Sequence, residues 1–184
     1  MKILVVDIET TGFVVKWDII TEIGIALVDT DTGKIDLVFD NVVKHWKWNP
    51  KKHKYGWCFK NTSLTVEDVE KAKTIASYKN EIQRLFDIYP MTAYNKSFDI
   101  RFLSSCGFKM NDVKCLMKTA KEYSKYKTKT GAKKTPSVEE IYNQFFMKDG
   151  EVYVEQHRAG VDVMDEAKIL LHMVELKKQK QLII

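Results

Sequence analysis

Residues 2–12 read Lys-Ile-Leu-Val-Val-Asp-Ile-Glu-Thr-Thr-Gly, an apolar run that ends in two acidic side chains. The run over residues 2–8 predicts a buried strand. Because side chains alternate along a strand, Asp7 and Glu9 share one face, with their Cα atoms about 6–7 Å apart. Two carboxylates this close raise each other's pKa unless a cation lies between them, and oxygen ligands suit Mg²⁺ or Mn²⁺. Taken alone, such a pair is more often two solvent-exposed acids at the end of a strand.

The residues that follow predict a hairpin and one more short strand. Strands are expected over residues 21–29 and near residues 35–43, joined by the turn-rich segment 29–33. A fourth strand is expected over residues 91–94. Capping residues and apolar stripes at helical spacing predict helices between and after these strands. The predicted starts are Thr65, Ser77, Ser97 and Ser137, and the last helix carries Val163, Ala167, Leu170 and Val174. This order favours an α/β domain in which helices pack on a mixed sheet.

Two further segments place acidic residues near expected helix starts. Asn95-Lys-Ser-Phe-Asp99 follows the fourth strand and puts an acid in the first turn of a helix, where acids also occur simply to complement the helix dipole. His157-Arg-Ala-Gly-Val-Asp162 puts a histidine in a loop and an acid at the start of the last helix. Neutral imidazole is well suited to accept a proton near pH 7, although a single His–Asp pair is more often structural.

Taken together and in this order, the three segments resemble the three exonuclease motifs of the DEDDh, or DnaQ-like, family of 3′–5′ exonucleases in the ribonuclease H-like superfamily. That family includes the proofreading epsilon subunit of bacterial DNA polymerase and ribonuclease T. The resemblance extends from residue 2 to about residue 175, nearly the whole chain. Tyr94 departs from the pattern, because the family often has a histidine before the asparagine of the second motif. The residues that match the motifs are Asp7, Glu9, Asp99, His157 and Asp162.

The resemblance implies a ribonuclease H-like fold, a central mixed five-stranded sheet in the order 3-2-1-4-5 flanked by helices. It also implies two divalent cations, Mg²⁺ or Mn²⁺, held by four carboxylates. Asp7 would bridge both ions, Glu9 and Asp162 would complete the site of the attacking water, and Asp99 would serve the second ion. His157 would deprotonate that water, which attacks the terminal phosphodiester and releases nucleoside 5′-monophosphates from a 3′ end.

Contacts with the terminal nucleotide are expected from the residues around the first two motifs. The backbone of Thr10, Thr11 and Gly12 is expected to approach the nucleotide, because glycine permits close approach to a ligand. Phe13 is expected to wedge against a base, with core packing as an equal alternative. Asn95 of the second motif is grouped with these substrate-binding residues. The expected partner is the 3′ end of single-stranded DNA or RNA.

Length and composition limit the other possibilities. The chain has 184 residues, of which 45% are hydrophobic and 30% charged, as is typical of one folded domain spanning residues 1–184. No apolar run approaches the roughly 18 residues of a membrane span, and the N-terminus does not resemble a signal peptide. Three cysteines without a CxxC pair indicate reduced thiols. We therefore expect a cytoplasmic protein with no membrane partner.

The net charge of +5 is unevenly distributed. Residues 114–134 contain eight lysines and one acid, whereas residues 44–60 contain six lysines, no acid and five aromatic residues. Lysines neutralise phosphates and aromatic rings stack on unpaired bases, so residues 44–60 suit single-stranded nucleic acid. A solvated lysine-rich surface with a few core aromatics is nevertheless the commoner outcome for such a stretch.

Three functions follow from these features. The first is a 3′–5′ exonuclease on single-stranded DNA or RNA, and the second is a catalytically inactive member of the fold that binds nucleic acid or a polymerase. The third is an enzyme restricted to short oligonucleotides. All five catalytic positions are filled, which argues against the second function. No polymerase-binding segment is visible, so a free-standing enzyme is favoured over a tethered proofreader. DNA and RNA stay equal alternatives, because the 2′-hydroxyl is sensed by the shape of the pocket.

Overall fold

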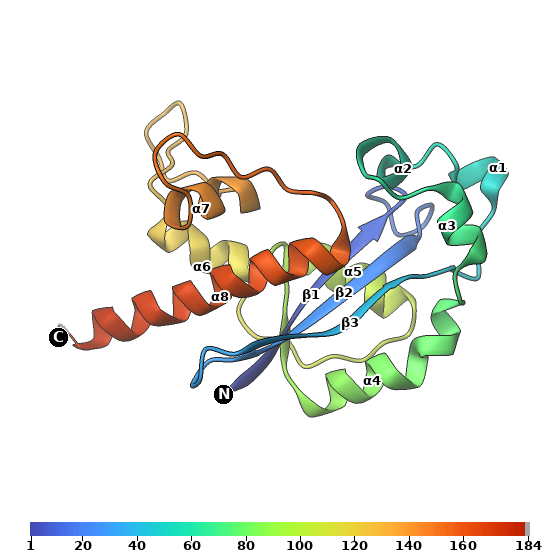
Figure 1. Ribbon diagram of the computed structural model, residues 1–184, viewed down its shortest axis with the longest axis horizontal. Helices are drawn as coiled ribbons and strands as arrows, with labels where there is room; N and C mark the ends of the chain where they lie inside the picture. Colours follow the sequence, from blue (N-terminus) through green and yellow to red (C-terminus); the bar gives the residue numbers. More distant parts are fainter. Residues whose placement is uncertain (183–184) are drawn as a thin grey trace.

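The sheet is built around the N-terminal strand, as Figure 1 shows. In this computed structural model, which describes residues 1–182, β1 (Lys2–Thr10) pairs antiparallel with β2 (Ile20–Asp29). β2 in turn pairs antiparallel with β3 (Ile35–Val42), which confirms the predicted hairpin. The two-residue strand β4 (Met91–Thr92) runs parallel to β1 on its other side, so the strand order is 3-2-1-4. Residues 183 and 184 of the predicted domain lie outside the described residues.

The prediction of a fifth strand was wrong for the described residues, whose sheet has four strands. The chain does pass beside β4 at residues 111–113. The N–H of Met91 donates to the carbonyl oxygen of Asn111 at 2.8 Å, and the N–H of Val113 donates to that of Met91 at 2.9 Å. The pairing ends at one parallel bridge between Met91 and Asp112. Asparagine and aspartate form strands poorly, which limits this segment to a single bridge.

A helix start also shortens β4, which was expected to reach residue 94. The N–H groups of Leu116 and Met117 donate to the carbonyl oxygens of Ala93 and Tyr94, at 3.3 and 3.0 Å. These carbonyls therefore satisfy the first turn of a helix rather than a neighbouring strand. The ladder cannot extend past Thr92 while this helix occupies the edge.

Helices cover both faces of the sheet, which confirms the predicted mixed α/β architecture (Figure 1). No helix among residues 1–182 has both the length and the apolar composition needed to cross a bilayer. The helices are α1 (Pro50–His53), α2 (Trp57–Asn61), α3 (Val66–Lys71), the 3-10 helix η1 (Ile75–Tyr78), α4 (Lys79–Ile88), α5 (Lys96–Ser105), α6 (Leu116–Tyr123), α7 (Val138–Phe145) and α8 (Ala159–Leu182).

Local capping chemistry sets several of these boundaries. Thr65 and Ser137 each form a reciprocal capping box at the start of α3 and α7, as predicted. The prediction that Ser77 caps α4 was wrong, because Ser77 lies inside η1 and α4 begins two residues later without a side-chain cap. Ser97 lies one residue inside α5 rather than at its start. Capping boxes were therefore reliable signals, and single serines were not.

Alternate side chains of β1 face different helical layers. Ile3 and Val5 belong to the core formed with α6, α7 and α8, whereas Leu4 packs in the core formed with α4 and α5. Because this alternation has a period of two residues, Asp7 and Glu9 continue the row of Ile3 and Val5. The apolar pattern of β1 thus directs both acids toward the side of the sheet that α8 covers.

The helices α1, α2 and α3 form a small lobe beside the end of β1 that carries the acids (Figure 1). Its interior is a separate cluster around Cys58, Leu64 and Val69. The backbone N–H of Trp57 donates to the carbonyl oxygen of Thr11 at 2.7 Å. This bond ties the start of α2 to the loop that follows β1, so the lobe is attached directly beside the candidate site.

Candidate active site

The two acids of β1 lie at the end of the sheet. Asp7 is half-buried and Glu9 is buried. In the antiparallel pairing, Asp7 lies opposite Gly24 and Glu9 lies opposite Glu22. Burial, together with the charges of Asp162 and Glu22, raises the pKa of Glu9 to about 9. Without a compensating cation, this carboxyl is therefore mostly protonated at neutral pH.

The second motif places its acid inside the molecule and its asparagine outside. Asp99 lies in the first turn of α5 and is buried, and burial raises its pKa to about 7. Asn95 immediately precedes α5 and is exposed, and its Oδ1 accepts a hydrogen bond from the hydroxyl of Ser97 at 3.2 Å. Helical geometry thus separates the two residues, with Asp99 alone directed toward β1.

The third motif folds around a single carboxylate. Asp162, in the first turn of α8, is almost fully buried. Its two oxygens accept the backbone N–H groups of Gln156 at 3.2 Å and Arg158 at 3.0 Å. His157 lies between these two amides and has a φ of 53°, a left-handed conformation that is uncommon outside glycine. Asp162 therefore fixes the loop that presents the imidazole.

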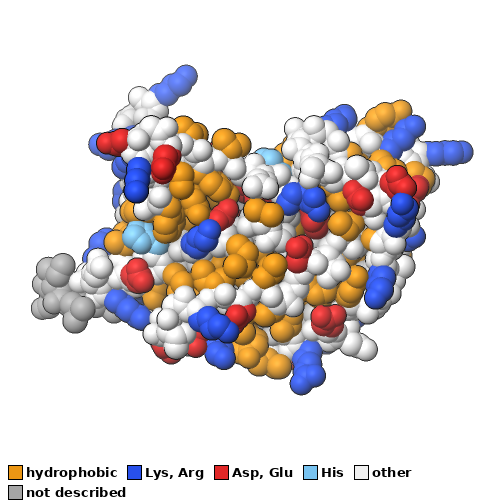
Figure 2. Space-filling model, in the orientation of Figure 1, with side chains coloured by type: hydrophobic (Ala, Val, Ile, Leu, Met, Phe, Trp, Pro, Cys, Tyr) orange, Lys and Arg blue, Asp and Glu red, His pale blue; other side chains and the backbone are white. Residues whose placement is uncertain are grey.

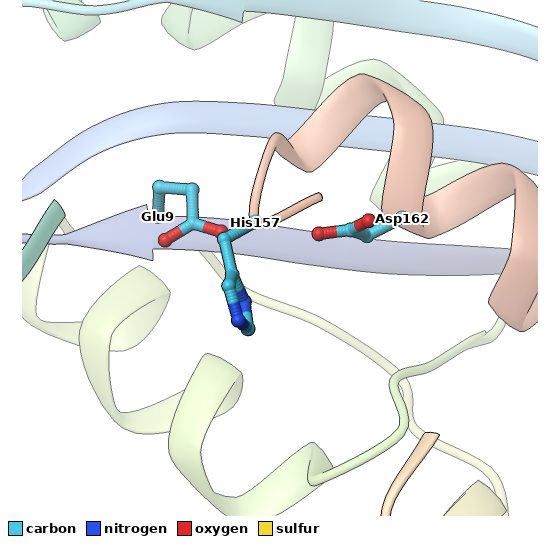
Figure 3. Close-up of side chains that lie close together, drawn as sticks. All are labelled: Glu9, His157 and Asp162. Atoms are coloured by element: carbon cyan, nitrogen blue, oxygen red, sulfur yellow. The ribbon is translucent and has the colours of Figure 1, made fainter. Parts of the chain in front are cut away.

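Glu9, His157 and Asp162 converge from three different places in the fold (Figure 3). Glu9 projects from β1, His157 from the loop before α8, and Asp162 from the helix itself. Each offers one possible ligand atom, and these atoms all lie within 4.8 Å of one another. Such a set of two carboxylates and one imidazole is compatible with a divalent cation.

Asp7 lies within electrostatic reach of the other predicted acids. Burial raises its pKa well above its usual range, and the charges of Glu166, Glu9, Asp99 and Asp162 raise it further. The structure thus gathers the four acids that the motifs single out around one place. Several buried carboxylates without a cation remain largely neutral, because their ionised forms repel one another in a weakly solvated site. This donor set fits divalent cations that prefer oxygen ligands.

Glu166 is an acid that sequence reasoning missed. It lies one turn after Asp162 on α8, is buried, and accepts the backbone N–H of Tyr94 at 3.1 Å. Burial raises its pKa well above the usual range. The signal was present, because residues four apart on a helix share a face. It was overlooked because this part of the helix was interpreted only through its apolar stripe.

Arg158 and Glu22 were also missed. The guanidinium of Arg158 donates from Nε to both carboxylate oxygens of Glu22, at 3.1 and 3.0 Å, and from Nη2 to Oε1 at 2.8 Å. Its Nη1 donates to the hydroxyl of Ser63 at 3.0 Å. Arg158, which follows His157, is thereby held to β2. No local signal links two residues that are 136 positions apart.

The threonines of the first motif use their side chains within the loop. The hydroxyl of Thr10 donates to the carbonyl oxygen of Gly12 at 2.6 Å, and that of Thr11 accepts the N–H of Ile19 at 3.1 Å. Both threonines are buried. Any contact of these residues with a nucleotide would therefore come from the backbone, as the sequence analysis expects.

Phe13 does not pack in the core, because 66% of its surface is exposed. Its ring centroid lies 6.3 Å from that of Trp57 and 6.2 Å from that of Phe98. Trp57 in turn contacts His157 edge-on, with ring centroids 5.0 Å apart and planes at 83°. An aromatic wall thus leads from an exposed ring to the imidazole. Trp57 is one of five aromatic residues in residues 44–60, and no pattern in that stretch predicts its place beside the imidazole.

A mixed sheet flanked by helices, with buried acids from three chain segments beside a histidine, is the arrangement that the sequence predicts for an exonuclease. The model of the family described as Exonuclease, RNase T, matches residues 4–170, and the chain belongs to this family. This match confirms the prediction that the chain belongs to an exonuclease family. No curated protein matches the chain.

Solved structures of exonucleases share the fold. The nuclease domain of 3′hExo, a DEDDh family member bound to rAMP, has a TM-score of 0.72 at 17% identity over 95% of this chain and 92% of that one. The cell-death related nuclease CRN-4 has a TM-score of 0.69 at 18% identity over 95% of this chain. Exonuclease I of E. coli in complex with a dA16 oligonucleotide has a TM-score of 0.62 at 16% identity over 94% of this chain. The chain spans 64% of CRN-4, 40% of Exonuclease I and 60% of a full-length 3′-exonuclease.

Proposed function

We propose that residues 1–184 form one exonuclease domain that releases nucleoside 5′-monophosphates from the 3′ end of single-stranded DNA or RNA. The observation that carries this proposal is the convergence of Glu9, His157 and Asp162 within 4.8 Å, beside Asp7. Membership of the exonuclease family and the oligonucleotide bound to a structural relative support it. The free thiols of all three cysteines support a cytoplasmic site of action.

Asp7, Glu9, Asp99 and Asp162 would hold two divalent cations, Mg²⁺ or Mn²⁺, which when bound would stabilise charge on the phosphate and activate water. The protein contributes a preorganised arrangement of these acids. Burial favours the protonated form of these carboxyls in the absence of cations, as the raised pKa values of Glu9 and Asp99 indicate. Cation binding would therefore release protons from the site.

His157 would accept the proton of the attacking water. A neutral imidazole is the side chain best suited to this role around pH 7. Its position depends on two neighbours. Asp162 binds the backbone on both sides of it, and Trp57 packs edge-on against its ring. Both contacts restrict the ring to the space beside Glu9.

Phe13 and Trp57 would hold the base of the terminal nucleotide. The exposed ring of Phe13, beside Trp57, offers a stacking face that is available only to an unpaired base. The backbone of residues 10–12 would lie against the sugar and phosphate, because the threonine hydroxyls are already engaged. This arrangement supports single-stranded rather than duplex substrates.

The proposal is tested by digesting 5′-labelled single-stranded DNA, duplex DNA and single-stranded RNA with Mg²⁺, with Mn²⁺ and with a chelator. A ladder that shortens from the 3′ end, only with a cation and preferentially on single strands, is expected. Substrates of two to five nucleotides beside a 20-mer distinguish a general exonuclease from one restricted to oligonucleotides. Cleavage in chelator would refute the cation-dependent mechanism. No cleavage of any substrate would refute the proposal and favour the inactive alternative.

His157→Ala tests the assignment of the base. The rate is expected to fall by about 10²–10⁴-fold with substrate binding largely kept. His172→Ala provides the control, because His172 lies within α8 against Phe145 and outside the cluster of Glu9, His157 and Asp162. A loss confined to KM in the His157 variant would show that the residue binds substrate and does not act as the base.

A further inference from the structure

A hollow lies next to the candidate active site, in the lobe formed by α1, α2 and α3. Its lining includes Thr11, Trp17, Lys52, Tyr55 and Gly56. Thr11 belongs to the first motif and Trp17 to the loop after β1. Lys52 lies in α1, and Tyr55 and Gly56 lie between α1 and α2. The hollow therefore shares a wall with the catalytic edge but contains none of the four acids.

Two large aromatic rings in this lining are exposed. Trp17 is 55% exposed and Tyr55 is 65% exposed. Each ring has ammonium groups near its face. The Nζ atoms of Lys16 and Lys52 lie 4.8 and 5.4 Å from the Trp17 ring centre, and that of Lys54 lies 4.9 Å from the Tyr55 ring centre. Exposed rings beside cations are the combination that binds unpaired bases and their phosphates.

The charge around the hollow is suited to an anion. Lysine and arginine side chains lie on the side of the molecule that α1 to α3 occupy, with acidic side chains among them (Figure 2). Residues 44–60 contain no acid. The one acidic side chain of the lining, Asp18, is engaged by the N–H of Val14 at 2.8 Å and the hydroxyl of Thr11 at 3.2 Å. The lysines around the hollow are therefore free to meet phosphates.

A short segment connects the hollow to the active site. Gly56 lies so close to the loop after β1 that an added Cβ would be 2.7 Å from the Cβ of Thr11. On one side of Gly56, Tyr55 lines the hollow, and on the other, Trp57 contacts His157. The Cα atoms of residues 55 and 57 are at most about 7 Å apart. A strand that leaves the active site thus reaches the hollow without crossing the rest of the lobe.

From this juxtaposition we propose that the hollow binds unpaired nucleotides of a single-stranded polynucleotide, upstream of the 3′ end that enters the active site. The direction of the strand rests on the proposed exonuclease function, but binding in the hollow does not. Trp17 and Tyr55 provide stacking faces, and Lys16, Lys52 and Lys54 neutralise phosphates. The aromatic rings favour nucleic acid over an acidic peptide, which would use the lysines but not the stacking faces.

The test measures binding of fluorescently labelled dT20 and rU20 in chelator, so that no strand is cleaved. Trp17→Ala is expected to weaken binding by roughly 5- to 150-fold, the effect of losing one stacked base. Trp17→Phe retains a ring and should retain most of the affinity. Lys52→Gln should reduce the slope of log affinity against log salt by about 0.7. Comparison of dT20 with rU20 shows whether the hollow prefers single-stranded DNA or single-stranded RNA.

Matched controls separate this hollow from a general surface effect. Trp46 is 56% exposed in the same basic stretch, but it stacks on His45 and lies outside the lining. Trp46→Ala should leave binding within about 2-fold, and so should Lys148→Gln, at an exposed lysine after α7. Hydrolysis of the p-nitrophenyl ester of thymidine 5′-monophosphate, which is too short to reach the hollow, should be unchanged by Trp17→Ala.

Three results would overturn the proposal. The first is binding by Trp17→Ala and Tyr55→Ala that equals that of the unaltered chain or of Trp46→Ala. The second is equal affinity for polyglutamate, and the third is equal affinity for vesicles of anionic lipid. Failure of the exonuclease function gives a different pattern, in which the unaltered chain binds dT20 through Trp17 but cleaves nothing when cations are added. If Trp17→Ala does not fold, Tyr55→Ala carries the same test.

Discussion

Arg158 holds Glu22 in a two-pronged ion pair, with three N···O distances between 2.8 and 3.1 Å. Glu22 is buried and lies opposite Glu9 in the sheet, whereas Arg158 directly follows His157. The pair therefore couples the loop that carries the imidazole to the strand beside the acids. Because this ion pair holds Arg158 in place, the backbone of the adjacent His157 has little freedom to move. Arg158 is therefore a positioning residue for His157.

Glu22→Gln tests this coupling. The substitution preserves the shape of the side chain but replaces a charge-assisted pair with neutral hydrogen bonds, a loss of roughly 1–1.5 kcal/mol. We expect kcat to fall about 10-fold with KM changed less than 2-fold, and Tm to fall as well. Glu67→Gln, which breaks an exposed pair with Lys71 on α3, is the control and should change neither. A lower Tm with unchanged kcat would show that the pair only stabilises the fold.

Gly24 provides the second test of how the site is assembled. An added Cβ would lie 2.2 Å from the carbonyl oxygen of Ala159, so the first residue of α8 rests directly on β2. Gly24→Ala must displace the start of this helix, at a cost of about 1–3 kcal/mol for overpacking. Because a displacement of about 1 Å can cost roughly 100-fold in rate, we expect a large loss of kcat in a folded protein. Thermal unfolding and steady-state kinetics measure both effects, and a kcat within 2-fold of the unaltered chain would contradict the argument.

The features that the sequence predicted well depend on residues that are close together within one helix or strand. Alternation in β1 placed Asp7 and Glu9 on one face, and the capping box at Ser137 gave the start of α7. The order of three motifs predicted that acids from distant segments meet, and the structure brings Glu9 and Asp162 together with His157. These predictions needed no knowledge of which strands pair.

The features that sequence missed depend on long-range packing. A fifth strand would require residues 111–113 to pair with β4 over several residues. The pairing stops at a single bridge, because α6 begins a few residues later and its first turn uses the carbonyl groups that follow β4. The ion pair of Arg158 and Glu22 joins two elements whose contact no pattern in either segment reveals. Glu166 is a different case. Its spacing from Asp162 predicts that the two acids share one face of the helix, but only the structure shows that Glu166 is buried.

Asp7→Asn is expected to separate stability from activity. Asp7 sits among the charges of four other acids, and burial adds to its cost of ionisation. Removing its charge should abolish turnover and weaken Mn²⁺ binding, because a central cation ligand is lost. In chelator the same change should raise Tm, because folding no longer requires the Asp7 carboxyl either to take up a proton or to ionise among the other acids. Calorimetric titration with Mn²⁺ and thermal unfolding in chelator measure the two effects.

Asp87→Asn is the control for this substitution, because Asp87 is an exposed acid on α4. It should alter neither the affinity for Mn²⁺ nor turnover. Full activity of Asp7→Asn would contradict the assignment of Asp7 to the cation site. An unchanged Tm in chelator would show instead that the acids are better solvated than their burial indicates.

The stability of the cation-free protein should depend on pH in an unusual direction. The pKa of Glu9 rises from 4.5 to about 9 on folding, and that of Asp99 rises from 3.8 to about 7. The folded chain therefore holds protons that the unfolded chain has released. Since stability falls with pH wherever the folded state binds more protons, these two groups should destabilise the protein progressively between about pH 4 and pH 9 in chelator.

Glu9→Gln isolates one of these contributions, because glutamine stays neutral at every pH. In chelator its free energy of unfolding should decline less than that of the unaltered chain between pH 4.5 and pH 9, the interval between the two pKa values of Glu9. Urea unfolding across this range provides the measurement, and Glu81→Gln, at an exposed acid on α4, should follow the unaltered chain. Adding Mn²⁺ should stabilise the unaltered chain more at high pH than at low pH, because the cation then replaces protons that are costly to retain. Parallel pH curves for the unaltered chain and Glu9→Gln would mean that Glu9 ionises freely in the folded state, and the argument that its burial prepares a cation site would fail.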